Sequence, residues 1–365
     1  MGRMAEVSAR RDGFVPVREM VDSLSVGAYA AVPDDLVLHQ AGWTLFTFDF
    51  VTSEAVFTDT GGTDLAAQPF AYQSQYRTAR RLLRLPFASL GGLAAQVPKP
   101  APILQVFNMG HCGSTLLHHV FNASGSVWCV SEPLFTFELA VRRDELGPDR
   151  LGELMRAGMA FVRLYPGADA HGQIAVKHFS QATTIIGACH KAEPAPHHLF
   201  LYRGGERWCN SLYGFVQRLG GTLELAPERR EFMWGMMSGA TPRSRLADIV
   251  DMTADSVTID QLAAVAWALH IGACRAAVAE GVPLVPVRYE DLVQDRQGTL
   301  TAAFAACGLG TAGVGRALAA FARDSHEGTA TAKSVPVEPL PPEAAERIRA
   351  VLGHPSLGLT GDEIL

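Results

Sequence analysis

The stretch "NMGHCGSTLL", residues 108–117, places glycines, a histidine, a cysteine and two hydroxyls between an apolar run and a helix-like run. Gly110 and Gly113 permit a tight turn that presents backbone N–H groups. A helix that begins near Ser114 adds the positive end of its dipole, and Ser114 and Thr115 add hydroxyl donors. These features suit a multiply charged phosphate, although an ordinary strand–turn–helix corner capped by serine would look alike.

This loop lacks the lysine of an ATP or GTP loop. Such a loop reads G-x-x-x-x-G-K-[ST], with the lysine on the terminal phosphates. Here Ser114 follows Gly113 directly, and Gly110 lies only three residues earlier. The pattern therefore predicts a phosphate other than that of a typical nucleoside triphosphate.

Further polar residues follow the other apolar runs. "LYRGGERWCNSLYGF" places Arg203 after a predicted strand and Ser211 eight residues later, on a predicted helix. The planar fork of arginine makes two-point, charge-assisted bonds to phosphate oxygens. A surface ion pair with Glu206 is the alternative for Arg203. "VWCVSEP" places Glu132 after another predicted strand. In "VPLVPVRYEDLV" a predicted strand is followed by Tyr289 and two acids, and we interpret the acids as ties between a loop and the sheet.

Strands and helices must alternate to position these residues. The predicted strands are "PILQVF", "SVWCV", "GQIAVKHF", "HHLFLYR" and "VPLVPVRY", separated by helical or loop-like segments. This order predicts an α/β fold, a parallel sheet flanked by helices on both faces. Ligands bind beyond the carboxyl ends of the strands in such sheets. All of the polar residues above follow a strand.

The first hundred residues have a different character. "WTLFTFDF" and "AVFTDT", joined by "VTSE", predict a β-hairpin, and "AYQSQYRTARRLLRL" predicts a short helix before the breaker "QVPKPAP". We therefore expect a β-rich N-terminal accessory region over residues 1–96 and the main α/β core over 97–365.

Composition excludes several classes of protein. The formal net charge of −6 argues against a nucleic-acid binder. The six scattered cysteines fit reduced thiols and neither a disulfide framework nor a metal site. The N-terminus has no apolar signal segment, and the apolar run 262–279 contains a histidine and an arginine, which favours a buried helix over a membrane span. We expect a soluble, cytoplasmic protein.

Taken in order, these motifs resemble the sulfotransferases that use 3′-phosphoadenosine-5′-phosphosulfate (PAPS). The resemblance covers residues 100 to about 295 and implies a P-loop NTPase-like sulfotransferase core. It also implies roles for individual residues. The loop with Gly110, His111, Cys112, Gly113, Ser114 and Thr115 would hold the 5′-phosphosulfate, Arg203 and Ser211 the 3′-phosphate, and Tyr289 the adenine. The late segment "SHEGTATAKS" would add Lys333 or Ser334 to the nucleotide site, although a surface loop fits it equally.

One position departs from the family's pattern. Family members usually carry lysine or arginine at the place of His111, where it stabilises charge on the departing phosphate. A protonated histidine supplies such a charge, and nearby phosphates favour that form. Lys177, at the end of "IAVK", is the alternative cation, in which case His111 only packs in the loop.

Sulfuryl transfer also needs a base for the acceptor's proton. Our candidate is Glu132, which Pro133 biases toward an extended backbone. His178 in "VKHF" is the second candidate. It directly follows Lys177, and neighbouring side chains of a strand point to opposite faces, so both would not face one site.

The sequence thus predicts transfer of a sulfuryl group from PAPS to a hydroxyl or amine of a small-molecule or carrier-bound acceptor, with no metal. Two other readings stay open: a non-catalytic nucleotide-binding module of the same fold, and a small-molecule kinase. The missing loop lysine and the lack of an evident magnesium carboxylate argue against the kinase. The acceptor itself cannot be read from the sequence.

Overall fold

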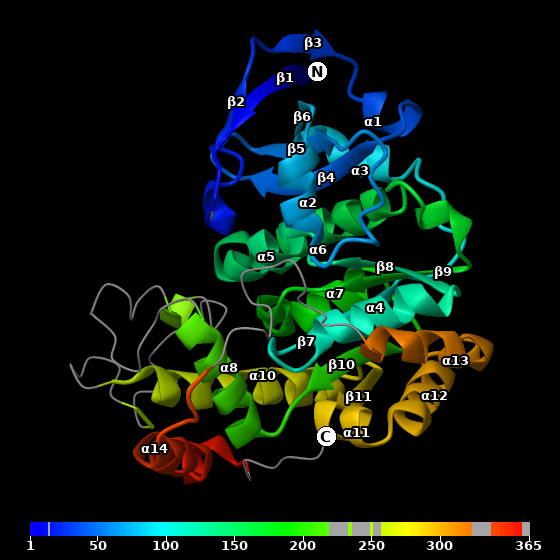
Figure 1. Ribbon diagram of the computed structural model, residues 1–365. Helices are drawn as coiled ribbons and strands as arrows, with labels where there is room; N and C mark the ends of the chain where they lie inside the picture. The colour runs from blue at the N-terminus through cyan, green and yellow to red at the C-terminus, as the bar shows by residue number, and fades with distance from the viewer. Residues whose placement is uncertain (14, 219–232, 236–248, 251–256, 323–336, 360–365) are drawn as a thin grey trace. The chain divides into compact units, whose positions relative to one another are not determined.

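The computed structural model describes residues 1–13, 15–218, 233–235, 249–250, 257–322 and 337–359 (Figure 1). Contacts group the chain into two compact units. The first comprises Met1–Gln105, Phe121–Phe179 and Ala188–Pro196, and the second Val106–Val120, Ser180–Gly187 and His197–Leu365. This division differs from the predicted domains 1–96 and 97–365, whose independence stays a prediction.

The first unit contains an antiparallel sheet built from the first ninety residues. Its strands are β1 (Gly2–Arg10), β2 (Leu24–Val26), β3 (Ala30–Val32), β4 (Trp43–Asp49), β5 (Glu54–Asp59) and β6 (Arg81–Pro86). Their order is β2-β1-β6-β5-β4, with β3 paired to β1. The predicted hairpin is confirmed as β4 and β5, which close with Asp49 opposite Glu54.

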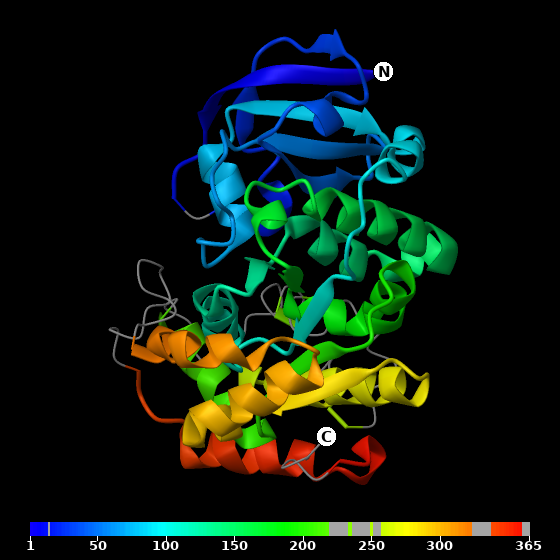
Figure 2. The same ribbon diagram turned by 90° about the vertical axis from the view of Figure 1, so that its right-hand side faces the viewer.

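Helices cover this sheet within the same unit. Helices α5 (Leu134–Val141) and α6 (Arg143–Val162) pack against β4 (Figures 1 and 2). Phe48 of β4 meets Phe135 edge-on, with ring centroids 5.9 Å apart. Phe57 of β5 meets Phe161 in the same way at 5.0 Å. Because both sides of these strands are covered, β4 and β5 are almost wholly buried.

The prediction of one helix over "AYQSQYRTARRLLRL" is wrong in its second half. Helix α2 ends at Thr78, after beginning at Ala71, and the remainder forms strand β6. Leucines such as Leu83 and Leu85 are fully buried there, and β6 pairs with both β1 and β5. Pairing on two edges therefore overrides the local helix propensity of this segment.

The five predicted core strands are all present and form one parallel sheet. They are β7 (Leu104–Asn108), β8 (Val127–Ser131), β9 (Gln173–Lys177), β10 (His198–Tyr202) and β11 (Leu284–Arg288), in the order β11-β10-β7-β9-β8. Strand β11 lies at an edge, where the exposed Pro286 costs the sheet no ladder bond. The predicted fold class, a helix-flanked parallel sheet with a β-rich N-terminal extension, is confirmed.

Further helices lie before, between and after these strands in the chain. They are α1 (Leu36–His39), α3 (Phe87–Ala94), α4 (Ser114–Ser124), α7 (Ile186–Ala192), α8 (Gly205–Arg218), α10 (Ile259–Ala279), α11 (Tyr289–Gln294), α12 (Arg296–Ala306), α13 (Val314–Ala317) and α14 (Pro342–Leu352). By length and composition α10 could cross a membrane, but 61% of its most apolar stretch is buried within the structure. It packs against α8 and α14, as a core helix does.

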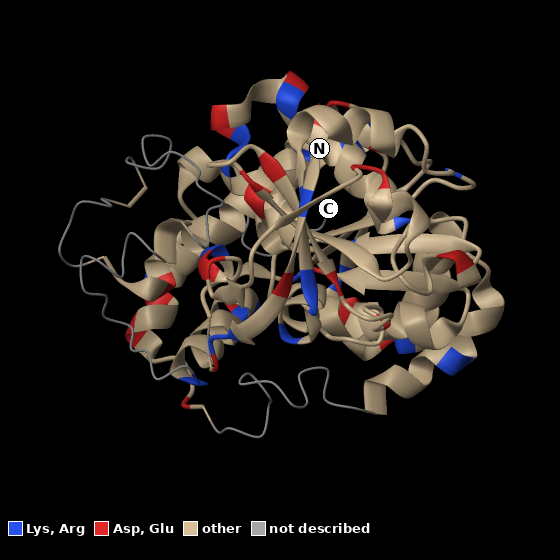
Figure 3. Ribbon diagram, turned by 90° about the horizontal axis from the view of Figure 1, so that it is seen from above, with Lys and Arg blue, Asp and Glu red and all other residues tan. Residues whose placement is uncertain are grey.

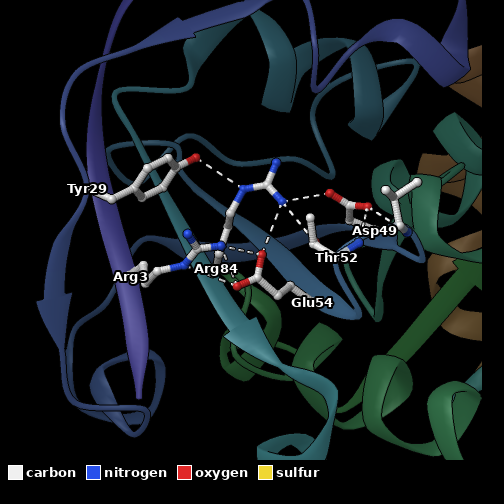
Figure 4. Close-up of polar contacts among 7 residues, drawn as sticks. Arg3, Tyr29, Asp49, Thr52, Glu54 and Arg84 are labelled. Atoms are coloured by element: carbon white, nitrogen blue, oxygen red, sulfur yellow. Dashed lines mark hydrogen bonds and ion pairs between the residues drawn. The ribbon is translucent and has the colours of Figure 1, made fainter.

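A network of charged side chains joins the strands of the antiparallel sheet (Figure 4). Arg84 donates to Asp49 at 2.7 Å and to the Tyr29 hydroxyl at 3.1 Å. Glu54 accepts from Arg3 at 2.7 and 2.8 Å and from Arg84 at 3.4 Å. Acidic and basic residues are likewise interspersed over the other described elements (Figure 3). Each charge of the network has an opposite partner, which fits a role in stability.

This network predicts a loss of stability in acid. Burial raises the pKa of Asp49, but hydrogen bonds from Arg84 and the Thr52 backbone outweigh burial and hold it below the usual 3.8. The unfolded chain therefore takes up this proton at a higher pH than the folded chain. The contribution of Asp49 is complete above its unfolded pKa and is lost as the pH falls through its folded pKa.

Urea unfolding at a series of pH values from about 5 to about 3 measures this contribution. The free energy of unfolding should fall more steeply for the wild type than for Asp49→Asn. Equal slopes for the two proteins would show that Asp49 carries no such contribution.

Candidate functional site

The loop after β7 has an unusual backbone that the glycines permit. Gly110, His111 and Gly113 have φ values of +72°, +46° and +82°. The Gly110 N–H donates to the Asn108 side-chain oxygen at 2.9 Å, which fixes the start of the turn. A non-glycine residue such as His111 rarely adopts positive φ, and residues held this way cluster at functional sites. Helix α4 begins directly after the loop at Ser114, as predicted.

The loop side chains divide into two groups. Cys112 is fully buried, and its thiol donates to the Leu201 carbonyl at 3.3 Å, so this side chain faces the sheet. His111 is partly exposed, and its ring lies 4.7 Å from that of Phe215 on α8. Ser114 and Thr115 are buried at the start of α4. A phosphate here would meet backbone N–H groups and hydroxyls, with Cys112 contributing only its backbone.

Two buried tryptophans hold this region, and the sequence reasoning missed both. The Trp208 indole N–H donates to the Gly110 carbonyl at 2.7 Å. The Trp267 indole N–H donates to the Arg203 carbonyl, also at 2.7 Å. Because these bonds attach α8 and α10 to the backbone beside the candidate site, the tryptophans are positioning residues. The only sequence signal was a tryptophan five residues after Arg203.

Replacing Trp208 with phenylalanine should therefore loosen the loop. The ring still fills its space, but the Gly110 carbonyl loses its partner, at a cost of roughly 0.5–1.5 kcal/mol, the net contribution of one hydrogen bond. We expect binding of adenosine 3′,5′-bisphosphate to weaken by up to this amount in calorimetric titration.

Trp128→Phe is the matched control, because the Trp128 indole donates to Asp64 within the first unit. Unchanged binding by Trp208→Phe would show that the loop keeps its shape without this bond.

Arg203 lies against the loop and the Tyr289 ring. Its guanidinium carbon is 4.8 Å from the centre of the Tyr289 ring, and its Nη1 donates to the His111 carbonyl at 3.3 Å. Within the part of the chain that the structure describes, its buried Nε makes no hydrogen bond and lies 3.8 Å from Glu290. The guanidinium thus faces the loop through Nη1 and Glu290 through Nε. Glu206, the alternative partner, pairs instead with Arg349 at 3.0 Å.

Tyr289 packs on the loop itself. A Cβ atom at Gly113 would lie 2.5 Å from the tyrosine ring, closer than any side chain tolerates. Glycine at position 113 thus serves both the backbone conformation and this contact. The tyrosine ring touches the loop and the arginine that the sequence assigned to the same nucleotide.

Glu290 is the acid that ties this region together. It lies 3.4 Å from Arg288, 3.8 Å from Arg203 and 3.9 Å from Arg207, and it accepts from the Gly204 N–H at 3.3 Å. These contacts confirm Glu290, one of the two acids, as a tie between the loop at Gly204 and strand β11.

Three other candidate ligands were predicted, Ser211, Lys333 and Ser334. Ser211 lies on α8, about two turns from its start, and is partly exposed. Lys333 and Ser334 lie outside the described residues.

Glu132 and Lys177 form a second group, in the first unit. The carboxylate of Glu132 is bonded to the ammonium of Lys177, whose side chain is 1% exposed against 16% for Glu132. The Glu132 N–H also donates to the Lys177 carbonyl at 2.7 Å. Lys177 thus holds Glu132 through both its side chain and its backbone.

The predicted backbone of Glu132 is wrong. Its φ is +54°, in place of the extended value expected before Pro133. Proline favours an extended backbone in the residue before it, but this preference is local. Lys177 at the end of the neighbouring strand accepts from the Glu132 N–H and binds its carboxylate, and these two contacts outweigh the preference. Glu132 is thus, with His111, one of three non-glycine residues with positive φ in the described chain.

His178, the alternative base, is fully buried. Its Nε2 lies 3.2 Å from the side-chain oxygen of Gln105. Lys177 and His178 therefore have different partners, as the alternation of side chains along a strand predicts.

Tyr72 is an aromatic neighbour of Glu132 that sequence reasoning did not single out. Burial raises the pKa of Tyr72, and the charge of Glu132 raises it further. The Tyr72 hydroxyl accepts from Gln73 at 3.1 Å and stays protonated at neutral pH. Among the described residues, no group of three or more His, Cys, Asp and Glu side chains could hold a metal ion.

Comparisons with known proteins find likeness in structure but not in sequence. No family model and no curated protein sequence matches the chain. A solved structure of a sulfotransferase from Alicyclobacillus acidocaldarius aligns with 72% of this chain and 97% of its own, with 13% identity and a TM-score of 0.42. At this level the likeness assigns neither family nor function to the chain.

Proposed function

We propose that this chain is a soluble, cytoplasmic sulfotransferase that uses PAPS. It would transfer the sulfuryl group to a hydroxyl or amine of a small-molecule or carrier-bound acceptor. The observation that carries the proposal is the lysine-free loop 110–115 with Arg203 and Tyr289 packed against it. That combination suits an adenine nucleotide that carries separate phosphates at the 5′ and 3′ positions of its ribose.

The phosphates would be divided between two sets of donors. The backbone N–H groups of the loop, with the Ser114 and Thr115 hydroxyls, would take the 5′-phosphosulfate at the start of α4. Arg203 and Ser211 would take the 3′-phosphate, with the contact of the Arg203 guanidinium with the loop as support. Tyr289 would contact the adenine, and Lys333 remains a proposed ligand.

The acceptor's proton would pass to Glu132. The acceptor oxygen attacks sulfur, the bond from sulfur to the bridging phosphate oxygen breaks, and the Glu132 carboxylate takes the released proton. The other product is adenosine 3′,5′-bisphosphate. The fixed position of Glu132 supports this role, because a base must be held within reach of the proton it removes.

A cation must meet the charge that develops on the departing phosphate. His111 and Lys177 remain the proposed candidates. The pairing of Lys177 with Glu132 already occupies part of its donor capacity, which makes His111 the stronger candidate in the resting protein. No metal is required by this scheme.

Calorimetric titration with adenosine 3′,5′-bisphosphate and with ATP, each with and without magnesium, tests the proposal. We expect the bisphosphate to bind without magnesium and ATP to bind more weakly. Tighter, magnesium-dependent binding of ATP would favour a kinase and overturn the proposal. Bisphosphate binding without sulfate transfer to any member of an acceptor library would favour a non-catalytic module.

A further inference from the structure

A buried histidine in the second unit lies close to the residues that support the loop after β7. His270 of α10 is 3% exposed, and its ring meets that of Trp208 edge-on, with ring centres 6.3 Å apart. Its Nδ1 lies 2.7 Å from the hydroxyl of Thr183. Thr183 is also buried and belongs to the 3₁₀ helix η3 (Ser180–Ile185). His270 therefore joins three elements of this unit, α10, α8 and η3.

The hydrogen bonds of Thr183 determine which partner donates. The Thr183 hydroxyl donates to the Ser180 carbonyl at 2.9 Å. Because a hydroxyl has a single proton to donate, its oxygen must accept in the contact with His270. The imidazole therefore donates from Nδ1, and a chain of hydrogen bonds runs from His270 through Thr183 to Ser180.

This chain reaches the turn of the loop at Gly110. A Cβ atom placed on Gly110 would lie 3.7 Å from both Cβ and Oγ of Ser180, so Ser180 lies directly beside the turn. Trp208, the ring next to His270, donates to the Gly110 carbonyl at 2.7 Å. His270 is thus linked to Gly110 by two routes, one through Thr183 and Ser180 and the other through Trp208.

An imidazole is costly to bury unless it makes hydrogen bonds, as His270 does. An apolar side chain would fill the same space without this cost. What the imidazole adds is a directed bond to Thr183 and an edge-on contact with the Trp208 indole, and a satisfied buried network makes its surroundings rigid. A rigid turn binds a phosphate more tightly, because less conformational freedom is lost on binding.

We propose that His270 and Thr183 are positioning residues that hold the turn at Gly110 in the shape that receives the 5′-phosphate of the nucleotide. They act through Ser180 and Trp208 and do not touch the ligand. The identity of the ligand rests on the proposed function, whereas the positioning of the turn does not.

Thr183→Val tests this role, because valine keeps the shape of threonine and removes its hydroxyl. In calorimetric titration, Thr183→Val should bind adenosine 3′,5′-bisphosphate about three- to tenfold more weakly than the wild type, the equivalent of one hydrogen bond. Adenosine 3′-phosphate has no 5′-phosphate for the loop, so its affinity should barely change. Thr183→Ser retains the hydroxyl and should bind both ligands like the wild type.

Two further variants separate positioning from stability. Thr183→Val leaves the His270 Nδ1 donor without its acceptor, whereas Thr183→Val/His270→Leu removes both partners and should regain stability. Its affinity for the bisphosphate should nevertheless remain low. Thr136→Val is the matched control, because Thr136 is fully buried and donates to the Pro133 carbonyl, three residues earlier, at 2.9 Å in the first unit. It should bind both nucleotides like the wild type.

Hydrogen–deuterium exchange of the amides of residues 110–115 measures the turn without any ligand and should be faster in Thr183→Val. Wild-type affinity for the bisphosphate in a folded Thr183→Val, equal losses for both nucleotides, or recovery of affinity by the double variant would overturn the positioning role. If the wild type binds neither nucleotide, the proposed function is wrong. In that case faster exchange in Thr183→Val would still support the positioning role, and exchange at the wild-type rate would overturn it.

Discussion

Replacing Glu132 with glutamine should lower kcat by about 10²–10⁴-fold, the usual contribution of a positioned base. Glutamine keeps the size and polarity of the side chain but cannot accept the acceptor's proton. Affinity for adenosine 3′,5′-bisphosphate should stay nearly unchanged, because the residues proposed to bind its phosphates lie elsewhere in the chain. Initial rates with a verified acceptor, together with titration of the bisphosphate, measure both effects.

The structure adds a control that this experiment requires. Glu132→Gln leaves the buried Lys177 without its carboxylate partner, and breaking a buried ion pair costs about 3–5 kcal/mol of stability. The double variant Glu132→Gln/Lys177→Met removes both charges and should recover much of that loss. If the double variant is stable but still inactive, the activity loss does not come from lost stability but from the missing base or the missing Lys177 charge, which Lys177→Met alone distinguishes.

Recovery of activity along with stability would show that Glu132 serves the fold. Near-wild-type turnover by Glu132→Gln itself would remove Glu132 from catalysis, and His178 would be the next residue to test.

Replacing Arg203 with alanine should weaken binding of adenosine 3′,5′-bisphosphate by about 2–5 kcal/mol, the range for losing one member of a desolvated charge pair. Adenosine 5′-phosphate lacks the 3′-phosphate, so its binding should barely change. Comparing the two ligands separates loss of the phosphate contact from general damage to the loop, which Arg203 also touches through the His111 carbonyl.

Arg207→Ala is the matched control for Arg203→Ala. Arg207 approaches the same Glu290 at 3.9 Å but is 67% exposed. It should leave the affinity for both ligands near that of the wild type. Equal losses for both ligands in Arg203→Ala would mean that Arg203 supports the loop and does not recognise the 3′-phosphate.

The sequence predicted the parallel sheet well because its signal is local and repeated. Each buried strand is a short apolar run between polar segments, and β7 to β11 all coincide with such runs. Strand β6 was missed because "RRLLRL" has no clear alternation, and its state depends on pairing with β1 and β5. These partner strands are distant from β6 in the sequence, so a local pattern does not reveal the pairing.

The sequence identified the candidate residues by their type and position. It did not predict which side chains surround them in the folded protein. Arg203 and Tyr289 could be identified because each directly follows a predicted strand. The contact of the Arg203 guanidinium with the Tyr289 ring could not, because it depends on how the loop folds. The ion pair between Glu132 and Lys177 joins residues 45 positions apart. The indole bonds of Trp208 and Trp267 could not be foreseen, because a buried tryptophan looks the same in sequence whether or not its N–H positions a site.

The interleaving of the two units bears on whether the protein is modular. The chain passes between the units five times, after residues 105, 120, 179, 187 and 196. Elements that precede residue 96 also bury later ones, since Phe48 covers Phe135 and the Leu45 carbonyl accepts from the Tyr165 hydroxyl at 2.6 Å. A fragment that starts at residue 97 would expose these rings. We therefore expect a fragment cut at the linker "QVPKPAP" to lose the packing that these later residues need.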